Sequence, residues 1–190
     1  IAFICSFYGF YKLFKLKSQV KNLKLGRDGE KAVGQYLELL RESGTKIFHD
    51  IVGESFNIDH VVISTKGIFT VETKTYSKPM KGKPEIQHYK TKLIINGFES
   101  TSDILTQAKA QANWLTFLLQ ELTGKSFQVK TVVAFPGWYI DCQTKDPDVW
   151  VLNPKAVPKY IENNQVKFTV EEVHFISSCL SRYIRNKESG

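Results

Sequence analysis

One stretch, from Asn57 to Lys74, constrains the fold more than any other part of this 190-residue chain. It contains two apolar, β-branched runs joined by a short glycine-containing turn, which is the sequence pattern of a β-hairpin. If Ile63 pairs with Ile68, the register places Asp59 opposite Glu72, with both side chains on one face. The sequence therefore predicts a hairpin that brings two carboxylates together.

A lysine completes this group. Lys74 lies two residues beyond Glu72 and points to the same face, because side chains alternate along a strand. Like charges opposite each other destabilise a strand pair, and a divalent cation removes that conflict. Mg²⁺ typically takes one or two carboxylates together with waters and phosphate oxygens, and a neighbouring lysine can orient or deprotonate water or neutralise a phosphate. The alternative is that all three residues are ordinary polar side chains on a solvated hairpin face.

An aspartate followed, about twelve residues later, by Glu-x-Lys across a hairpin resembles the arrangement of the PD-(D/E)xK nucleases. More narrowly, the chain resembles the nuclease-related domain (NERD) family over roughly residues 25–135. Two positions depart from the family pattern: Ile58 stands where proline is usual, and Ser102-Asp103 stands where Asn-Pro often precedes the glutamine. The resembling segments are Gly26-x-x-Gly29-Glu30, Ile58-Asp59-His60-Val61-Val62, Gly67-Ile68-Phe69, Val71-Glu72-Thr73-Lys74 and, downstream, Gln107.

The resemblance implies metal-dependent hydrolysis of DNA phosphodiester bonds, and the choice between DNA and RNA stays open. The implied cofactor is Mg²⁺, or alternatively Mn²⁺, held by Asp59, Glu72 and the Thr73 carbonyl. The implied catalytic residues are Glu30, Asp59, Glu72, Lys74 and Gln107. Two of these residues have a simpler structural explanation. Glu30 is an acid near the positive end of a helix dipole, and Gln107 is an ordinary polar residue on a helix surface. The competing function is a catalytically inactive, membrane-tethered module that binds nucleic acid or acts as a scaffold.

The alternation of strands and helices independently predicts an α/β domain. We expect a restriction-endonuclease-like central mixed β-sheet, with the hairpin at its core and helices on both faces. Helices are predicted from Asp28 as cap to about Ser43, from Ser102 or Asp103 to about Thr123, and after the capping box Thr169-x-x-Glu172. Strands are predicted at 46–52, 129–135 and 149–152, with a second hairpin through the Asn96-Gly97 turn.

A formal charge of +7 and a pI near 9.2 favour polyanionic partners, either nucleic acid or an anionic membrane surface. A basic segment follows the first hairpin, interleaved with Tyr76, His88 and Tyr89. We expect its lysines to contact a phosphate backbone and its aromatic rings to stack on bases, although a solvated loop is the alternative. The lysines are Lys78, Lys81, Lys83, Lys90 and Lys92.

The N-terminal segment differs in composition from the rest of the chain. Residues 1–11 are uncharged and rich in aromatic side chains, yet too few to span a bilayer, so they suit the end of a longer transmembrane helix. The lysines that follow suit the cytoplasmic side of the membrane. We therefore divide the chain into a membrane-anchor remnant with a basic juxtamembrane segment (1–24) and a nuclease-related domain with a C-terminal helical completion (25–190). A signal-peptide remnant and an amphipathic surface helix are the alternatives.

The three cysteines, Cys5, Cys142 and Cys179, have no CxxC spacing and an odd count. They predict neither a zinc site nor a disulfide framework, which fits a reducing compartment.

Overall fold

The computed structural model describes residues 2–53, 55–100, 103–144 and 146–188. The helices are α1 (Ala2–Glu38), the 3-10 helix η1 (Leu39–Ser43), α2 (Ile104–Thr123), the 3-10 helix η2 (Pro154–Ala156), α3 (Val157–Glu162) and α4 (Val170–Glu188). The strands are β1 (Lys46–Val52), β2 (Asn57–Ser64), β3 (Gly67–Thr73), β4 (Glu85–Tyr89), β5 (Lys92–Ile95), β6 (Phe98–Glu99), β7 (Val129–Ala134), β8 (Tyr139–Cys142) and β9 (Val149–Leu152).

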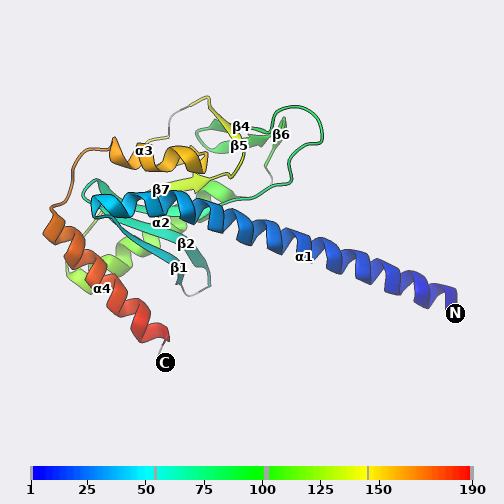
Figure 1. Cartoon of the computed structure of the whole chain (residues 1–190), viewed down its shortest axis with the longest axis horizontal. Helices are drawn as coiled ribbons and strands as arrows, with labels where there is room; N and C mark the ends of the chain where they lie inside the picture. Colours follow the sequence, from blue (N-terminus) through cyan, green and yellow to red (C-terminus); the bar gives the residue numbers. More distant parts are fainter. Residues whose placement is uncertain (1, 54, 101–102, 145, 189–190) are drawn as a thin grey trace.

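The centre of the domain is a five-stranded mixed sheet in the order β1-β2-β3-β7-β9 (Figure 1). The pairs β1–β2 and β2–β3 are antiparallel, whereas the pairs β3–β7 and β7–β9 are parallel. Ile63 pairs with Ile68, so the predicted hairpin register is confirmed. Helices cover both faces, as the α/β fold class requires.

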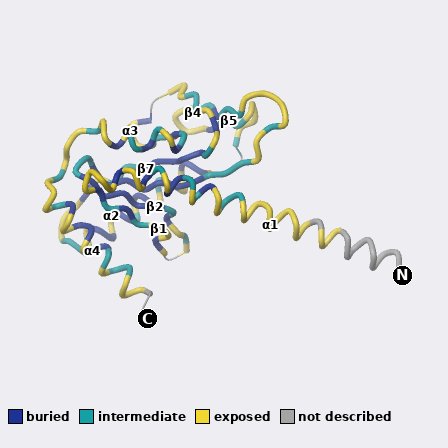
Figure 2. The backbone as a smooth tube through the Cα atoms, in the orientation of Figure 1, coloured by how far each residue is buried: buried dark blue, intermediate teal, exposed yellow. Residues whose placement is uncertain are grey.

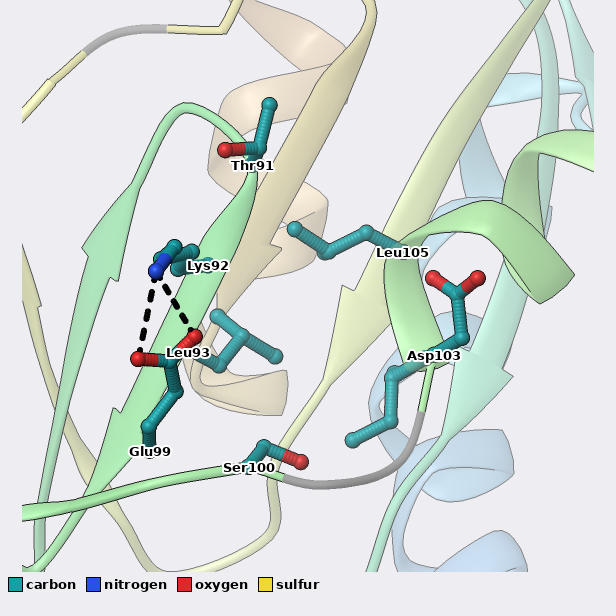
Figure 3. Close-up of a pocket in the computed structure, with 8 residues that line it drawn as sticks. Thr91, Lys92, Leu93, Glu99, Ser100, Asp103 and Leu105 are labelled. Atoms are coloured by element: carbon teal, nitrogen blue, oxygen red, sulfur yellow. Dashed lines mark hydrogen bonds and ion pairs between the residues drawn. The ribbon is translucent and has the colours of Figure 1, made fainter.

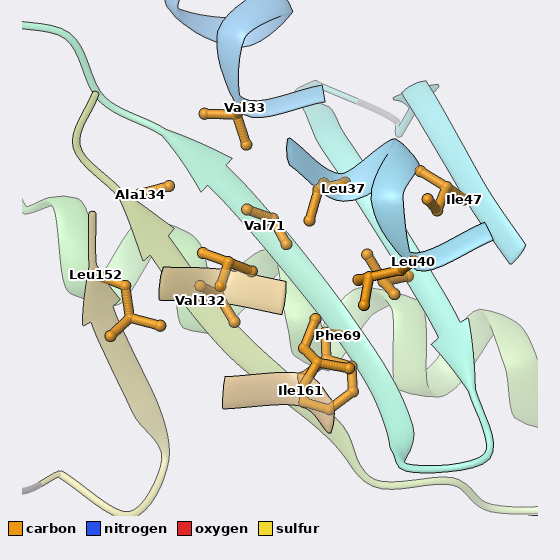
Figure 4. Close-up of a cluster of buried hydrophobic side chains, with 12 residues drawn as sticks. Val33, Leu37, Leu40, Ile47, Phe69, Val71, Val132, Ala134, Leu152 and Ile161 are labelled. Atoms are coloured by element: carbon orange, nitrogen blue, oxygen red, sulfur yellow. The ribbon is translucent and has the colours of Figure 1, made fainter. Parts of the chain in front are cut away.

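One face of this sheet packs against α1 and α3. Val33 and Leu37 of α1 lie one turn apart and contact the sheet together with Leu40 of η1, as Figure 4 shows. Their sheet partners include Phe69 and Val71 of β3, and all five side chains are buried. Burial of side chains of this size contributes about 1.5–3 kcal/mol each, so this apolar stripe holds the end of α1 on the sheet.

The opposite face packs against α2 and α4. Leu115 and Leu119 of α2 and Ile176 of α4 belong to one buried cluster with strand residues of the hairpin. The capping box that opens α4 is confirmed, because the Thr169 amide donates to Glu172 Oε2 (2.9 Å) and the Glu172 amide donates to Thr169 Oγ1 (3.2 Å).

A second, smaller sheet has the order β6-β5-β4-β8. The predicted Asn96-Gly97 turn joins β5 to β6, with φ angles of 50° and 82° that this tight turn requires. The strands β4 and β8 were not predicted, and β4 lies inside the basic segment, for which a solvated loop was the alternative to a phosphate contact. They pair in parallel, although short strands of mixed polarity show little periodicity in the sequence.

The predicted start of the first helix is wrong. Asp28 does not cap it, because α1 runs unbroken from Ala2 to Glu38 and the residues around Asp28 are mostly good helix formers without proline. The predicted end is correct, since Gly44 adopts φ 81° after η1. The N-terminal half of α1 extends beyond the domain, and its described side chains are mostly exposed (Figures 1 and 2). None of the described helices is both long and apolar enough to cross a bilayer.

Candidate active site

The predicted site residues gather where β3 ends. Glu72 is buried there, and Lys74 places its Nζ 2.6 Å from Glu72 Oε1. The second oxygen, Oε2, accepts a hydrogen bond of 2.9 Å from Nε2 of Gln111 on α2. Both oxygens of this carboxylate are therefore oriented by donors, one from each side.

Asp59 reaches the same place by a different route from the predicted one. The β2–β3 ladder ends at His60 and Val71, one pair before Asp59 and Glu72 would face each other. Asp59 Oδ2 instead accepts a hydrogen bond of 2.7 Å from the Thr73 amide. A side chain thus replaces the backbone partner at the end of the ladder, and this bond fixes Asp59 against β3.

Burial and neighbouring charges raise the pKa of two of the acids. Burial, followed by the nearby Glu72 carboxylate, raises the pKa of Asp59 to about 7. Burial also raises the pKa of Glu30, with further contributions from Asp50 and Glu72, whereas Lys74 lowers it. Glu30 on α1 therefore lies within electrostatic reach of the hairpin acids.

A glycine explains how α1 comes so near to the end of β3. A Cβ built on Gly29 would lie 2.2 Å from Cγ2 of Thr75, just beyond β3, so a side chain there would push the helix away. A Cβ on Gly26 would meet no described atom within 4 Å. Within the Gly-x-x-Gly-Glu segment, the second glycine is therefore the one that sets the position of Glu30.

The two glutamines of α2 differ in their contacts. Gln107 is exposed, and its Oε1 accepts a hydrogen bond of 3.3 Å from Lys74 Nζ. Gln111 is only 3% exposed and donates from Nε2 to the Asn57 carbonyl (3.1 Å) as well as to Glu72. The sequence analysis did not assign Gln111 to the site. Its four-residue spacing from Gln107 on one helix face was the available signal.

Asp50 is a second residue that the sequence analysis missed. It interrupts the β1–β2 ladder between the pairs His49–His60 and Ile51–Ile58, at the position that faces Asp59. Its φ of 52° is uncommon for a residue other than glycine, although aspartate tolerates this region better than most. Such a backbone conformation leaves no periodic signal in the sequence, which is why only the structure reveals this additional acid.

A histidine pair lies beneath α1, next to Asp59 in the chain. The Nδ1 atoms of His49 and His60 are 2.8 Å apart, and His49 Nε2 lies 3.2 Å from Glu38 Oε1. Burial, with a further contribution from His49, lowers the pKa of His60 to about 4. His60 is therefore neutral near pH 7 and adds no positive charge beside the acids.

The residues present fit a hard divalent cation. Asp59 and Glu72 are adjacent carboxylates, and two buried oxygens nearby, Gln111 Oε1 and Thr73 Oγ1, have no partner among the described residues. Mg²⁺ prefers such oxygen donors and retains several waters. Among the described residues, no three His, Cys, Asp or Glu side chains are grouped so that they could hold a metal ion. The protein would thus supply two acidic ligands, and carbonyl, water or phosphate oxygens would supply the rest.

The predicted nucleic-acid lysines divide into separate environments. Lys81 and Lys83 line a groove of about 790 Å³. Lys92 forms an ion pair of 2.9 Å with Glu99 beside a smaller pocket (Figure 3). Lys78 approaches Gly137, the side chain of Lys90 is exposed, and the Lys90 amide donates to Thr144 Oγ1.

Two of the three aromatic residues expected to stack on bases pack against the domain instead. The ring of Tyr76 packs against Phe135 and Trp138 and is half-buried, and His88 is buried. Only Tyr89 is exposed. The prediction failed because the structure folds this segment back onto the second sheet, so alternate residues point into the core.

A family model described as nuclease-related domain, NERD, matches residues 25–136. No curated protein sequence matches the chain. Among solved structures, SfsA of Pyrococcus furiosus in complex with Ca²⁺ is similar at 19% sequence identity with a TM-score of 0.31. That match covers 68% of this chain and 55% of the SfsA chain, so the chain spans about half the length of that protein.

Proposed function

Because the chain belongs to the nuclease-related domain family, we propose that it hydrolyses phosphodiester bonds of DNA with the help of a divalent cation, Mg²⁺ or Mn²⁺. The observation that carries this proposal is the convergence of Asp59, Glu72 and Lys74 at the end of β3. Two carboxylates and one ammonium group at a strand end provide both a cation site and a positive charge for a phosphate.

Each protein group has a separate task in this proposal. Asp59 and Glu72, with the Thr73 carbonyl, would hold the cation. A bound divalent cation supplies a more acidic water and stabilises charge that develops on the phosphate. Lys74 orients or deprotonates the attacking water, or neutralises the scissile phosphate. Gln107 restrains Lys74, and Glu30 is a third acid whose pKa is raised by burial and by the neighbouring acids, Asp50 before Glu72.

Nicking of supercoiled plasmid tests this function. We expect cleavage by the wild-type protein in Mg²⁺, no cleavage in EDTA, and no cleavage by Glu72→Ala. Glu121→Ala, which removes an exposed acid on α2, serves as the matched control and should cleave normally. Full activity of Glu72→Ala would refute the site. A wild-type protein that binds DNA but never cleaves it, in Mg²⁺ or Mn²⁺, would instead support the inactive binding or scaffold module. A parallel assay on RNA decides between the substrates.

We also propose that α1 tethers the domain to the cytoplasmic side of a membrane. Leu13, Leu16, Val20 and Leu23 recur on one exposed helix face, and five lysines accompany them without any acid before Asp28. The lysines are Lys12, Lys15, Lys17, Lys21 and Lys24. Sedimentation with anionic vesicles should recover the whole chain but not a variant that lacks residues 1–24. Equal recovery of both proteins would refute the tether.

A further inference from the structure

The second sheet is connected to the end of the central sheet that carries the candidate active site. The chain leaves β3 and β7 at their carboxyl ends, where the site lies, and then enters β4 and β8. These two strands are again parallel neighbours, and β4, β5 and β6 form a separate group at one end of the domain (Figure 1). Lys81 lies seven positions after Lys74 in the chain, which limits their Cα atoms to about 25 Å apart.

The groove on this sheet is basic on one side. Beyond Lys74, the connection between β3 and β4 continues through residues 75–84, which contain three lysines and no acid. Two of these lysines, Lys81 and Lys83, line the groove of about 790 Å³, whose only lining acid among the described residues is Glu85. Glu85 accepts a hydrogen bond of 3.2 Å from Gln87 Nε2, so its carboxylate already has a donor. The remaining lining is polar or apolar.

Large aromatic side chains are exposed on the same sheet. Phe98 lines the groove and is 79% exposed. Tyr139 is 63% exposed and pairs in register with Glu85, so both lie on one face of the sheet. An exposed phenylalanine gains nothing from the core of its own domain. Its position in a groove beside lysines therefore indicates a partner with flat apolar faces and negative charge.

We propose that this groove binds single-stranded nucleic acid, with a base stacked on Phe98 and phosphates beside Lys81 and Lys83. The choice of a single strand follows from the ring: an unpaired base can stack on an exposed aromatic face, whereas the bases of a closed duplex are stacked on one another. The lysines bind phosphates without regard to sequence. The groove deepens the proposed nuclease function, because it would lead the unpaired strand toward Lys74.

Binding without metal tests the groove separately from cleavage. Fluorescence anisotropy in EDTA would compare a short labelled DNA single strand, the equivalent RNA and a blunt duplex of the same sequence. Phe98→Ala should weaken single-strand binding about 5- to 150-fold, the range for loss of one base–aromatic stack, and change duplex binding less than about twofold. Phe117→Ala removes an exposed phenylalanine of α2 that does not line the groove, and it should bind like the wild type.

A fluorescent purine analogue within the single strand adds a readout specific for stacking, since its emission should be quenched by the wild-type protein but not by Phe98→Ala. Equal affinity of Phe98→Ala and wild type for the single strands would overturn the groove proposal. A wild-type protein that binds no single strand would overturn it as well. If the protein never cleaves but Phe98 still governs single-strand binding, the groove stands and the nuclease proposal fails. If cleavage occurs and Phe98→Ala binds single strands like the wild type, the nuclease proposal stands and the groove proposal fails.

Discussion

Gln111 on α2 and Glu72 on β3 are joined by a hydrogen bond of 2.9 Å, buried between the helix and the sheet. The same Nε2 also bonds the Asn57 carbonyl at the start of β2. One amide thus connects the helix to both strands of the central hairpin and holds the carboxylate that the candidate metal site requires.

Gln111→Leu should therefore lower both stability and activity. Leucine leaves Glu72 Oε2 and the Asn57 carbonyl without this donor, so we expect the free energy of unfolding to fall by about 1–3 kcal/mol. Loss of a group that orients a ligand should reduce Mg²⁺ affinity or cleavage about 10- to 100-fold. Urea denaturation and Mg²⁺ titration provide the measurements. Gln107→Ala is the control for stability, because its exposed amide should change the unfolding free energy by less than about 0.5 kcal/mol. Unchanged Mg²⁺ affinity and cleavage in Gln111→Leu would contradict this role.

Lys74 should affect the cleavage rate more than metal affinity, because a protonated lysine cannot ligate Mg²⁺. Lys74→Ala is expected to slow cleavage about 10²- to 10⁴-fold if the lysine transfers a proton. Lys74→Arg separates two roles, since arginine keeps the charge but holds its proton at any relevant pH. Partial activity of Lys74→Arg would indicate that Lys74 neutralises charge on the phosphate. Complete loss of activity would indicate that Lys74 acts as a base. Single-turnover rates measured at saturating Mg²⁺ would show this, and wild-type rates in both variants would remove Lys74 from the mechanism.

Asp59 should make the metal-free protein less stable as the pH rises. Its folded pKa of about 7 lies above the ordinary value near 3.9, so the folded state binds more protons between these two values. The free energy of unfolding of the wild type, relative to Asp59→Asn, should therefore fall from about pH 4 to pH 7 and then level off. His60 acts in the opposite direction, but it is present in both proteins and cancels. Urea denaturation in EDTA across this range is the measurement, and a flat difference would mean that Asp59 has an ordinary pKa.

Two glycines of α1 form a matched pair. Gly26→Ala should stabilise the protein by about 0.5–1 kcal/mol, because alanine favours a helix and meets no described atom. Gly29→Ala gains the same helix propensity but places a Cβ against Thr75, so we expect a net loss of about 1–3 kcal/mol. Cleavage should also fall in Gly29→Ala alone, as Glu30 moves with the helix. Thermal unfolding and plasmid nicking would measure both effects, and identical behaviour of the two variants would show that the close approach has no consequence.

Salt dependence measures the contribution of the groove lysines. The double variant Lys81→Ala/Lys83→Ala removes two phosphate contacts. The slope of log K, where K is the binding constant, against the logarithm of salt concentration should therefore become shallower by about 1.4 for single strands and about 1.8 for duplex DNA. Lys125→Ala/Lys159→Ala, which removes two exposed lysines outside the groove, should leave the slope unchanged. Deletion of residues 1–24 should also leave this slope unchanged. If the deletion abolishes DNA binding while the double variant retains it, the N-terminal lysines are the contact instead.

Much of the fold followed from local patterns in the sequence. The hairpin register through Ile63 and Ile68, the helix ends at Gly44 and Gly124 and the capping box at Thr169 all occur as predicted. Each depends on groups close together along the chain: strand periodicity, the backbone freedom of glycine, or a side chain that bonds its own helix. The convergence of Asp59, Glu72 and Lys74 was predictable for the same reason, because one short hairpin carries all three.

Tertiary structure decided the rest. Asp28 looks like a helix cap locally, yet the helix continues through it because the residues around it are mostly good helix formers, which one capping side chain does not outweigh. Tyr76 stands in a basic segment of the sequence, yet packing of its ring against Phe135 and Trp138 half-buries it. The contact of Gln111 with Glu72 joins residues 39 positions apart. Sequence periodicity indicates which face of a helix is apolar, but only the packing of α2 on the hairpin determines which polar side chain meets the buried carboxylate.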